Sequence, residues 1–474
     1  MQRATELWIG GQWVAADGGA TFEDLNPLDD AVFATAADAS PGDVERAVEA
    51  ATASAPDYAR TLPKEREAWL QRAAALLEER RSVIIDLLID EIGSPVGKAN
   101  FEFNKSLDMM RAAAGMSRQM TGATIPSDMP NRWSLSVRQP LGVVAAITPF
   151  NVPLIKGVRL TAHPLALGNT VVWLPSEHAP VLATTLAEIY HDAGLPAGAL
   201  NVVTGDGYRI GDTLTGHPDV AMVTFTGSSA VGQHINEVCA ARKARVTLEL
   251  GGKSALVVMD DADLSKAVAA ACHGIFTFQG QVCMGTSRIY VHRQVYDEFL
   301  AAFAAAAGQL GGGDLRDPTT VIGPIISERQ RERVREHIDQ AVGAGATVVT
   351  GGDWEGHRCR PTVLTGVTED MTLCAAETFG PVVAVYPVDS YDEALKRTND
   401  SDYGLSSAIF TRDLDRALDF ARNVNAGMCH VNASALHDEP HVPFGGNGQS
   451  GVGREGTEAD IEAMTEWKWI TIQV

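Results

Sequence analysis

The chain has 474 residues, with 38 Lys and Arg against 60 Asp and Glu, which gives a net charge of −22. This acidic balance argues against nucleic acids and anionic membranes as partners, and no apolar run approaches the roughly 20 residues that a membrane-spanning helix needs. The length exceeds what one simple core accommodates, so two or three domains are expected.

The first part of the chain is predicted to be mostly helical. Residues 7–15 are typical of a hairpin that turns at a Gly-Gly pair. A Ser-Pro pair predicts the start of a helix over residues 40–57, and a later proline predicts another from residue 63 through the apolar positions up to Leu88. A third helix is expected over residues 97–117.

Strand-like and helix-like segments alternate from residue 142 onwards. Strands are predicted at 143–148, 170–174, 200–204, 221–225 and 245–249, and helices at 152–167, 180–193, 208–216 and 229–242. A second set has strands at 255–259, 287–292, 347–350, 382–387, 406–410 and 428–431, and helices at 263–278, 294–308, 327–344, 390–399 and 413–424. This order indicates an α/β protein with a doubly wound parallel sheet and a second α/β domain, with ligands at the carboxyl ends of the strands.

Two further segments have β character outside these domains. Residues 132–138 alternate as a strand does, and residues 467–474 form an apolar run of β-forming side chains. We expect the first to be an arm, and the second to pair either with that arm or with another subunit.

A cysteine and a glutamate flank the expected domain boundary at Gly251-Gly252. Cys283 lies in a turn of small residues that can present backbone N–H groups to a developing oxyanion. A free cysteine is otherwise usually a small buried apolar residue. Glu249 ends the last strand of the first domain. A nucleophile and a carboxylate that activates water suit a two-step acyl chemistry, so we expect an active site in a cleft between the domains.

The stretch Gly227-Ser228 to Gly232 follows a predicted strand and opens a helix. Free N–H groups and the positive end of a helix dipole suit a diphosphate there, although any strand-to-helix turn can use Gly-Ser. Glu177 follows another strand, where an acid can accept hydrogen bonds from a ribose diol. A plain charge at a helix N-terminus is the equal alternative for Glu177.

Other motifs carry no function. Residues 446–451 match GxGxxG but open no βαβ unit. Residues 250–254 end like a phosphate-binding loop, but the first glycine of such a loop would fall at position 247, which is Thr247. The segment 437–441 lacks the spacing of metal ligands on one helix face, and no two of the six cysteines show CxxC spacing, so no metal is expected. The first residues lack an apolar signal segment, and we expect a cytoplasmic protein with reduced thiols.

Taken together, these stretches resemble the aldehyde dehydrogenase superfamily nearly from end to end. The resemblance implies that Cys283 is the nucleophile, Glu249 the general base and Asn151 the donor that stabilises the oxyanion. It also implies that an aldehyde is oxidised to the carboxylic acid through a thiohemiacetal and a thioester on Cys283. Residues 443–446 match the late signature of the family.

The resemblance also implies a nicotinamide cofactor. Its binding positions in this sequence are Thr148, Phe150, Glu177, Gly207, Gly227, Ser228, Gly232, Leu250, Glu377 and Phe379. Leu174 departs from the family pattern, which usually has a lysine there. A 2′-phosphate requires a cation and would be repelled by Glu177, so we favour NAD over NADP.

Three structural parts are implied by the same resemblance. These are a cofactor domain (1–122 and 141–250), a catalytic domain (251–454), and an oligomerisation arm and tail (123–140 and 455–474). The arm implies a homodimer or a homotetramer.

Several details resemble the branch that acts on aromatic aldehydes such as benzaldehyde, salicylaldehyde and vanillin. They are Phe150 in place of the commoner Trp, Met284 after the thiol, residues 437–439 before the late signature, and the ending 465–471. The residues expected near the substrate are Phe278, Val282, Met284 and His437. The alternative is an aliphatic aldehyde or semialdehyde dehydrogenase, which a cationic anchor for a carboxylate would favour; Lys156, Arg159 and Arg288 are the candidates. A non-catalytic binding protein of the same fold is a further alternative, and the intact set of Cys283, Glu249 and Asn151 argues against it.

Overall fold

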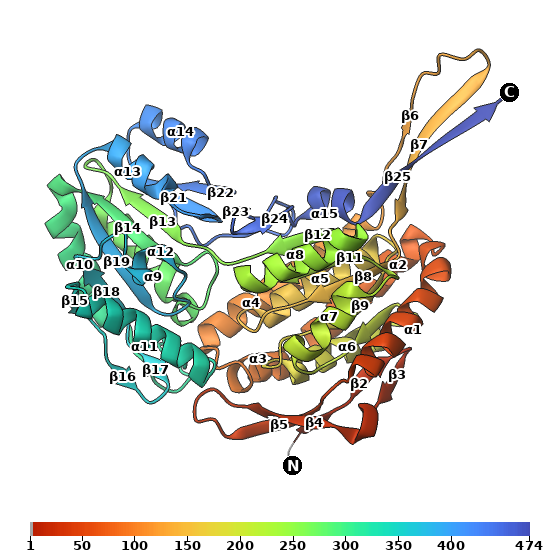
Figure 1. Ribbon diagram of the computed structural model, residues 1–474, viewed down its shortest axis with the longest axis horizontal. Coiled ribbons are helices and arrows are strands. Elements are labelled where there is room, and N and C mark those ends of the chain that lie inside the picture. The colour runs from red at the N-terminus through yellow and green to blue at the C-terminus, as the bar shows by residue number, and fades with distance from the viewer. Residues whose placement is uncertain (1–2) are drawn as a thin grey trace.

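A computed structural model describes residues 3–474 and shows two α/β layers with a ribbon that projects from one of them (Figure 1). The first sheet has the strand order β24 (Gly451–Val452), β12 (Arg245–Glu249), β11 (Val220–Thr226), β8 (Val143–Ile147), β9 (Thr170–Leu174), β10 (Leu200–Val202), β2 (Leu7–Ile9), β3 (Gln12–Val14). The strands from β12 to β10 are parallel, and β24 and the β2–β3 hairpin are antiparallel to their neighbours. The predicted parallel sheet and the hairpin are confirmed.

Helices cover both faces of this sheet because successive side chains of its strands point to opposite sides. On one face lie α2 (Pro63–Glu79), α3 (Arg81–Asp90), α4 (Val96–Met116), α5 (Pro153–Ala166) and α6 (Pro180–Asp192). On the other lie α1 (Pro41–Ala59), α7 (Gly207–Gly216) and α8 (Ser229–Arg242). Along β8, Val144 and Ala146 enter the first core, and Val143 and Ala145 enter the second.

The second sheet has the strand order β15 (Thr347–Thr350), β18 (Thr362–Thr365), β19 (Val382–Val388), β14 (Thr286–His292), β13 (Ser254–Val258), β21 (Ser406–Phe410), β22 (Met428–Val431). The strand β15 is antiparallel to its neighbour, and the others run parallel. Its helices are α9 (Leu264–Phe276), α10 (Tyr296–Gly308), α11 (Glu328–Gly343), α12 (Thr372–Ala375), α13 (Tyr391–Asn399) and α14 (Leu414–Asn423). The predicted second α/β layer is therefore present.

The ribbon pairs the arm with the end of the chain. The strand β7 (Arg132–Pro140) runs antiparallel to β25 (Thr465–Gln473) along its whole length, and β6 (Ala123–Thr124) adds to its other edge. In Figure 1 this ribbon extends away from both α/β layers. The helix α15 (Thr457–Ala463), just before β25, packs against α4 and α5 instead of extending with the arm.

The structure differs from the sequence predictions at several places. A small sheet of β1 (Arg3–Thr5), β4 (Thr21–Leu25) and β5 (Val32–Ala37) was not predicted, because short strands beside loops show little periodicity. The helix predicted from residue 63 to Leu88 is two helices, because Arg80 leaves the helical conformation. Two-stranded pairs, β16 (Trp354–Glu355) with β17 (Arg358–Cys359) and β20 (Tyr403–Gly404) with β23 (Asn447–Gly448), were also missed. Within residues 3–474, none of the helices is both long enough and apolar enough to cross a membrane.

Candidate active site

The turn that holds Cys283 begins where α9 breaks. The predicted helix 263–278 ends at Phe276, because Phe278 and Gln279 have φ values of 49° and 48° in the left-handed region. The side chain of Gln279 fixes the turn by donating to the carbonyl of Pro324 at 2.8 Å and accepting from Gly323 N at 3.1 Å. Non-glycine residues adopt such φ values at an energetic cost, so the surrounding contacts hold this turn in a strained form.

Glycine is required at position 280 for two reasons. Its φ is 70°, and a Cβ atom there would collide with the carbonyl of Gly380. The turn therefore lies directly against the segment that begins with Glu377.

Asn151 lies between β8 and α5, at the carboxyl edge of the first sheet. Its side-chain Nδ2 donates to the carbonyl of Gln281 at 2.8 Å, two residues before Cys283. Lys98 on α4 donates to the backbone carbonyl of Asn151 at 2.8 Å, and Glu102 accepts from Leu154 N at 2.9 Å at the start of α5. Helix α4 thus holds the asparagine turn, and one of the two amide N–H groups remains for a ligand.

Glu249 is the last residue of β12, and its carboxyl group is buried. Neither carboxyl oxygen has a hydrogen-bond partner among the described residues. A Cβ on Gly445 would lie 2.5 Å from Oε1 of Glu249, so this glycine leaves space for the carboxyl group. Burial raises the pKa of Glu249 well above its usual value, and the Glu455 carboxylate raises it further. Unpartnered buried carboxyl groups are typical of functional sites rather than of stable cores.

The thiol of Cys283 is half-buried against an apolar cluster of Met284, Leu405, Leu436 and Phe444. Burial raises the pKa of this thiol to about 12, and the ammonium of Lys156 has the largest opposing effect. The backbone around Gly252 is close enough that a Cβ there would lie 2.5 Å from the carbonyl of Cys283. Asn151, Glu249 and Cys283 therefore lie in one region of the molecule.

The buried face of α5 carries two cations that are neutralised by acids. Lys156 lies 2.7 Å from Glu455, and Arg159 lies 3.2 Å from the same carboxylate and 3.0 Å from Asp438. Arg159 is 1% exposed, and its pKa is raised by Asp438 and Glu455 despite burial. Both cations are therefore part of an ion-pair network.

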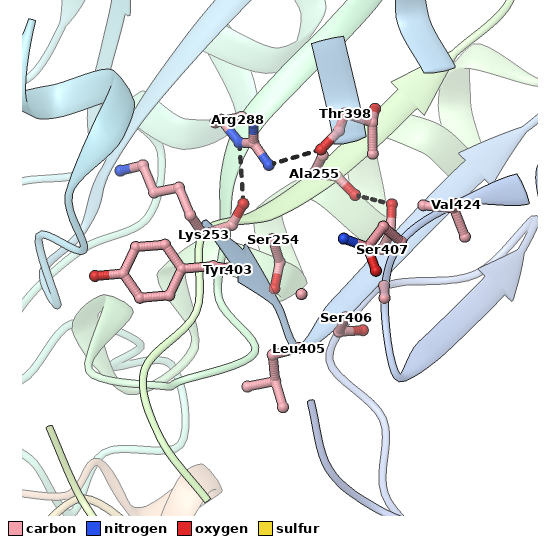
Figure 2. Close-up of a pocket in the computed structure, with 13 residues that line it drawn as sticks. Lys253, Ser254, Ala255, Arg288, Thr398, Tyr403, Leu405, Ser406, Ser407 and Val424 are labelled. Atoms are coloured by element: carbon pink, nitrogen blue, oxygen red, sulfur yellow. Dashed lines mark hydrogen bonds between the residues drawn. The ribbon is translucent and has the colours of Figure 1, made fainter. Parts of the chain in front are cut away.

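Arg288 lies in a separate pocket where β13, β14 and β21 of the second sheet begin (Figure 2). Its guanidinium donates to the carbonyls of Lys253 at 3.0 Å and Thr398 at 3.2 Å. Figure 2 also shows the bond of 3.2 Å from the hydroxyl of Ser407 to the carbonyl of Ala255. The guanidinium thus stabilises the backbone where strand β13 begins by hydrogen bonding to it.

The residues expected at a diphosphate lie at the start of α8. Ser228 caps this helix by accepting from Val231 N, and a Cβ on Gly232 would collide with the side chain of Leu250. Gly227 leaves β11 at the carboxyl edge of the sheet, as Asn151 leaves β8. A free helix N-terminus at this edge fits a dinucleotide.

The other positions expected at the cofactor extend from this edge towards the cysteine turn. Glu377 accepts from Gly252 N at 3.0 Å. The ring of Phe150 lies 5.9 Å from that of Phe379 and 5.8 Å from that of His178, edge-on in both cases. Residue Phe379 has a φ of 56°.

Three further positions expected at the cofactor lie in different surroundings. Glu177 is exposed just after β9, with His178 3.8 Å away. Gly207 opens α7 with free space around its Cβ position. The hydroxyl of Thr148 accepts from the indole of Trp173 at 2.9 Å.

The residues expected near the substrate lie in different surroundings. Val282 and Met284 belong to the cluster beside the thiol. Phe278 is buried in the first core, with the ammonium of Lys98 3.8 Å from its ring centre. His437 is exposed and bonds Glu439 at 3.0 Å.

Sequence reasoning missed the acids that pair with α5. Lys156 and Glu455 are 299 positions apart in the chain, and Arg159 and Asp438 are 279 apart. The sequence did carry one signal of this pairing. Lys156 and Arg159 have the spacing of residues on one face of a helix whose sequence is otherwise apolar, so both cations would need acidic partners. In the described part of the chain, no three His, Cys, Asp or Glu side chains converge as a metal ion requires.

The whole chain is similar to known proteins. The chain matches the aldehyde dehydrogenase family over residues 13–470. It is 42% identical to a vanillin dehydrogenase of Pseudomonas sp. (strain HR199 / DSM 7063) over 98% of this chain and 97% of the relative.

Two solved structures share the fold. One is a salicylaldehyde dehydrogenase from Pseudomonas putida G7 complexed with salicylaldehyde, with 36% identity, a TM-score of 0.97 and coverage of 100% of this chain and 99% of that one. The other is an E. coli NADP dependent enzyme, with 33% identity, a TM-score of 0.97 and coverage of 100% and 98%.

Proposed function

Because the chain belongs to the aldehyde dehydrogenase family, we propose that it oxidises aromatic aldehydes of the benzaldehyde type to carboxylic acids with NAD. The observation that carries the proposed chemistry is the bond from the Asn151 amide to the carbonyl of Gln281, beside Cys283. It supports an arrangement in which an amide donor and a thiol face the same carbonyl group of a substrate.

Each of the three residues has a role in one proposed step. The thiolate of Cys283 attacks the aldehyde carbon while the amide of Asn151 donates to the oxygen that becomes negative. Glu377 and Phe379 would hold a nicotinamide cofactor, which would supply the acceptor for the hydride that leaves the hemithioacetal on Cys283. Glu249 then accepts a proton from the water that attacks the thioester, and the carboxylic acid is released.

The charge balance of α5 supports an aromatic substrate over a semialdehyde. A semialdehyde requires a cation for its carboxylate, yet Lys156 and Arg159 are paired with Glu455 and Asp438. Arg288 bonds backbone carbonyls instead. The thiol packs against apolar side chains, which suit a flat apolar ring. The vanillin and salicylaldehyde dehydrogenases to which the chain is similar support the same substrate class.

The surroundings of the adenosine end support NAD. Members of the family use NAD or NADP. Leu174 is 2% exposed within the second core of the first sheet, so this position offers no contact to a ribose. The exposed carboxylate of Glu177 would attract a ribose diol and repel a 2′-phosphate.

We also propose the three-part division that the resemblance implies, except that β24 and α15 lie with the first sheet and its helices, and we propose the ribbon of β7 and β25 as an oligomerisation surface. Trp133, Trp467 and Trp469 are 60%, 50% and 71% exposed on this ribbon. Exposed aromatic groups on a projecting β ribbon favour association with another subunit.

Absorbance at 340 nm, with NAD and a set of aldehydes, tests the proposal. Benzaldehyde, salicylaldehyde and vanillin should exceed succinic semialdehyde and hexanal in kcat/KM. The reverse order would reject the aromatic class, and absence of NADH formation with every aldehyde would reject the reaction.

A further inference from the structure

Lys156 lies on a helix in which every residue is buried. Its side chain is 4% exposed, and its ammonium lies 2.7 Å from Oε2 of Glu455, whose side chain is 1% exposed. Lysine is among the residues that are almost never fully buried unless they are paired. Among residues 3–474 the ammonium makes one hydrogen bond, to Glu455, although it has three N–H groups. Two N–H groups of the ammonium remain for other neighbours. Its positive charge is only partly neutralised, because Glu455 also pairs with Arg159.

The Phe444-Gly445 pair connects Lys156 with both candidate reacting groups. The ammonium of Lys156 lies 4.8 Å from the centre of the Phe444 ring, in the cluster against which Cys283 packs. One residue further on, a Cβ on Gly445 would lie 2.5 Å from Oε1 of Glu249. A nucleophile, a base and a cation therefore adjoin the same two residues in a region with little solvent.

Several charges face Cys283. Glu377, near the start of β13, and Glu249, at the end of β12, both disfavour the thiolate, as does burial. Lys156 has the largest effect in favour of the thiolate, and a backbone hydrogen bond from Met284 adds to it. In a medium of low dielectric constant such a charge acts with little screening.

Glu249 has a comparable set of charged neighbours. Burial and the carboxylate of Glu455 disfavour its ionised form. Lys156 has the largest effect in the opposite sense, followed by Arg454 and Arg159. The same ammonium is thus the leading favourable charge for both groups.

We propose that Lys156 is a positioning residue whose ammonium, held by Glu455, favours the thiolate of Cys283 in the first step and the carboxylate of Glu249 in the second. This inference rests on the proposed roles of those two residues. Glu455 has a double effect, because it holds the ammonium in place and also opposes its charge. Its second oxygen, Oε1, is buried without a hydrogen-bond partner among the described residues. The Lys156–Glu455 pair therefore leaves some of its own hydrogen-bonding capacity unused.

Alkylation of Cys283 by iodoacetamide, followed by peptide mass spectrometry across a pH series, tests the first half of the inference. The variant Lys156→Gln keeps a donor for Glu455 and removes the charge, and Lys156→Met removes both. Each should alkylate about tenfold more slowly than the wild type near neutral pH, as a shift of about one pH unit in the midpoint produces. Lys156→Arg should retain the wild-type profile. The control Lys64→Met, at an exposed position on α2, should change nothing.

Glu455→Gln separates an effect of charge from an effect of structure. If Lys156 acts through its charge, removing the opposing carboxylate should shift the alkylation midpoint downwards, opposite to Lys156→Gln. If the ion pair merely supports the fold, both variants should lose reactivity in the same direction and unfold at lower temperatures. The steady-state pH profile with benzaldehyde should shift in the same two directions, because Glu249 faces the same charges.

The outcomes separate this inference from the proposed function. A folded Lys156→Gln protein with an unchanged alkylation profile would reject the role of Lys156 even if the wild type oxidises benzaldehyde. A wild type that forms NADH although Cys283 has been fully alkylated would instead reject the proposed nucleophile. Because alkylation needs neither an aldehyde nor a cofactor, it remains informative when no substrate is found.

Discussion

The side-chain amide of Asn151 donates a hydrogen bond of 2.8 Å to the backbone carbonyl of Gln281. This bond joins the carboxyl edge of the first sheet to the turn of Cys283, which belongs to the second α/β layer. It orients the amide so that one N–H group is occupied and the second is left for the proposed bond to a substrate oxygen.

Asn151→Ala should therefore slow the first turnover. Loss of one oxyanion donor costs about 2.7–4 kcal/mol, or roughly 10²–10³ in rate. The rate of the NADH burst, measured by stopped-flow absorbance, should fall by that factor with little change in the affinity for NAD. Asn236→Ala, at an exposed site on α8, is the control. A burst within threefold of the wild type would argue against Asn151 as a donor.

Glu249→Gln should separate the two chemical steps. Since the proposed role of the carboxylate is only to activate water, the variant should form one equivalent of NADH at close to the wild-type rate and then turn over far more slowly. Cys283→Ala should show no burst, because no covalent intermediate can form. If Glu249→Gln lowers the burst and the turnover equally, Glu249 does not act as the base for hydrolysis.

Turnover should depend on pH through the same carboxyl group. Burial and Glu455 raise the pKa of Glu249 above its usual value, so this group is protonated over a wider acidic range than an exposed glutamate. Its basic form appears as pH rises through that pKa, and kcat should rise with pH, about tenfold per unit on the acidic limb.

The burst rate should rise with pH as well, because the thiol of Cys283 also has a raised pKa. In Glu249→Gln, the burst should keep its pH dependence and the residual turnover should lose the acidic limb. An acidic limb that persists unchanged in the turnover of this variant would assign it to another group.

The alternation of strands and helices was predictable from sequence because it is a local pattern. The strands β8, β9, β11 and β12 appear within two residues of their predicted ends. The break at Phe278 was not predictable, because the left-handed turn depends on contacts that Gln279 makes with Gly323 and Pro324. The helical sequence pattern continues to residue 278, so the sequence predicted a helix there, although tertiary contacts bend the chain after Phe276.

The candidate site was predictable in part for a similar reason. Cys283 and Glu249 lie in short glycine-containing stretches whose composition is visible locally. The partners of Lys156 and Arg159 come from the last part of the chain, and nothing near those residues indicates the pairing. Ion pairs across almost 300 positions are a product of the fold, so the charge balance of the site required the structure.

Cofactor preference should respond to Glu177. Glu177→Gln removes the charge that would repel a 2′-phosphate, so the ratio of kcat/KM for NADP to that for NAD should rise about tenfold, or about 1.4 kcal/mol. Glu188→Gln is the control, because Glu188 is a partly exposed acid on α6; this variant should leave the ratio of kcat/KM for NADP to that for NAD unchanged. Leu174→Lys should lower the melting temperature, because its side chain would enter a packed core. A wild type that prefers NADP would contradict the prediction.

The ribbon of β7 and β25 provides the last prediction, which concerns assembly. Trp469 is 71% exposed on a ribbon that extends away from both α/β layers (Figure 1), so its ring is available to a second subunit. Trp469→Lys would place a charge in that contact and should shift the protein towards its monomer mass of 50.4 kDa, as measured by light scattering after size exclusion. Leu414→Lys, an equally exposed apolar position on α14, is the control and should leave the mass unchanged. If Trp469→Lys retains the wild-type mass across a dilution series, the ribbon is not the contact that holds subunits together.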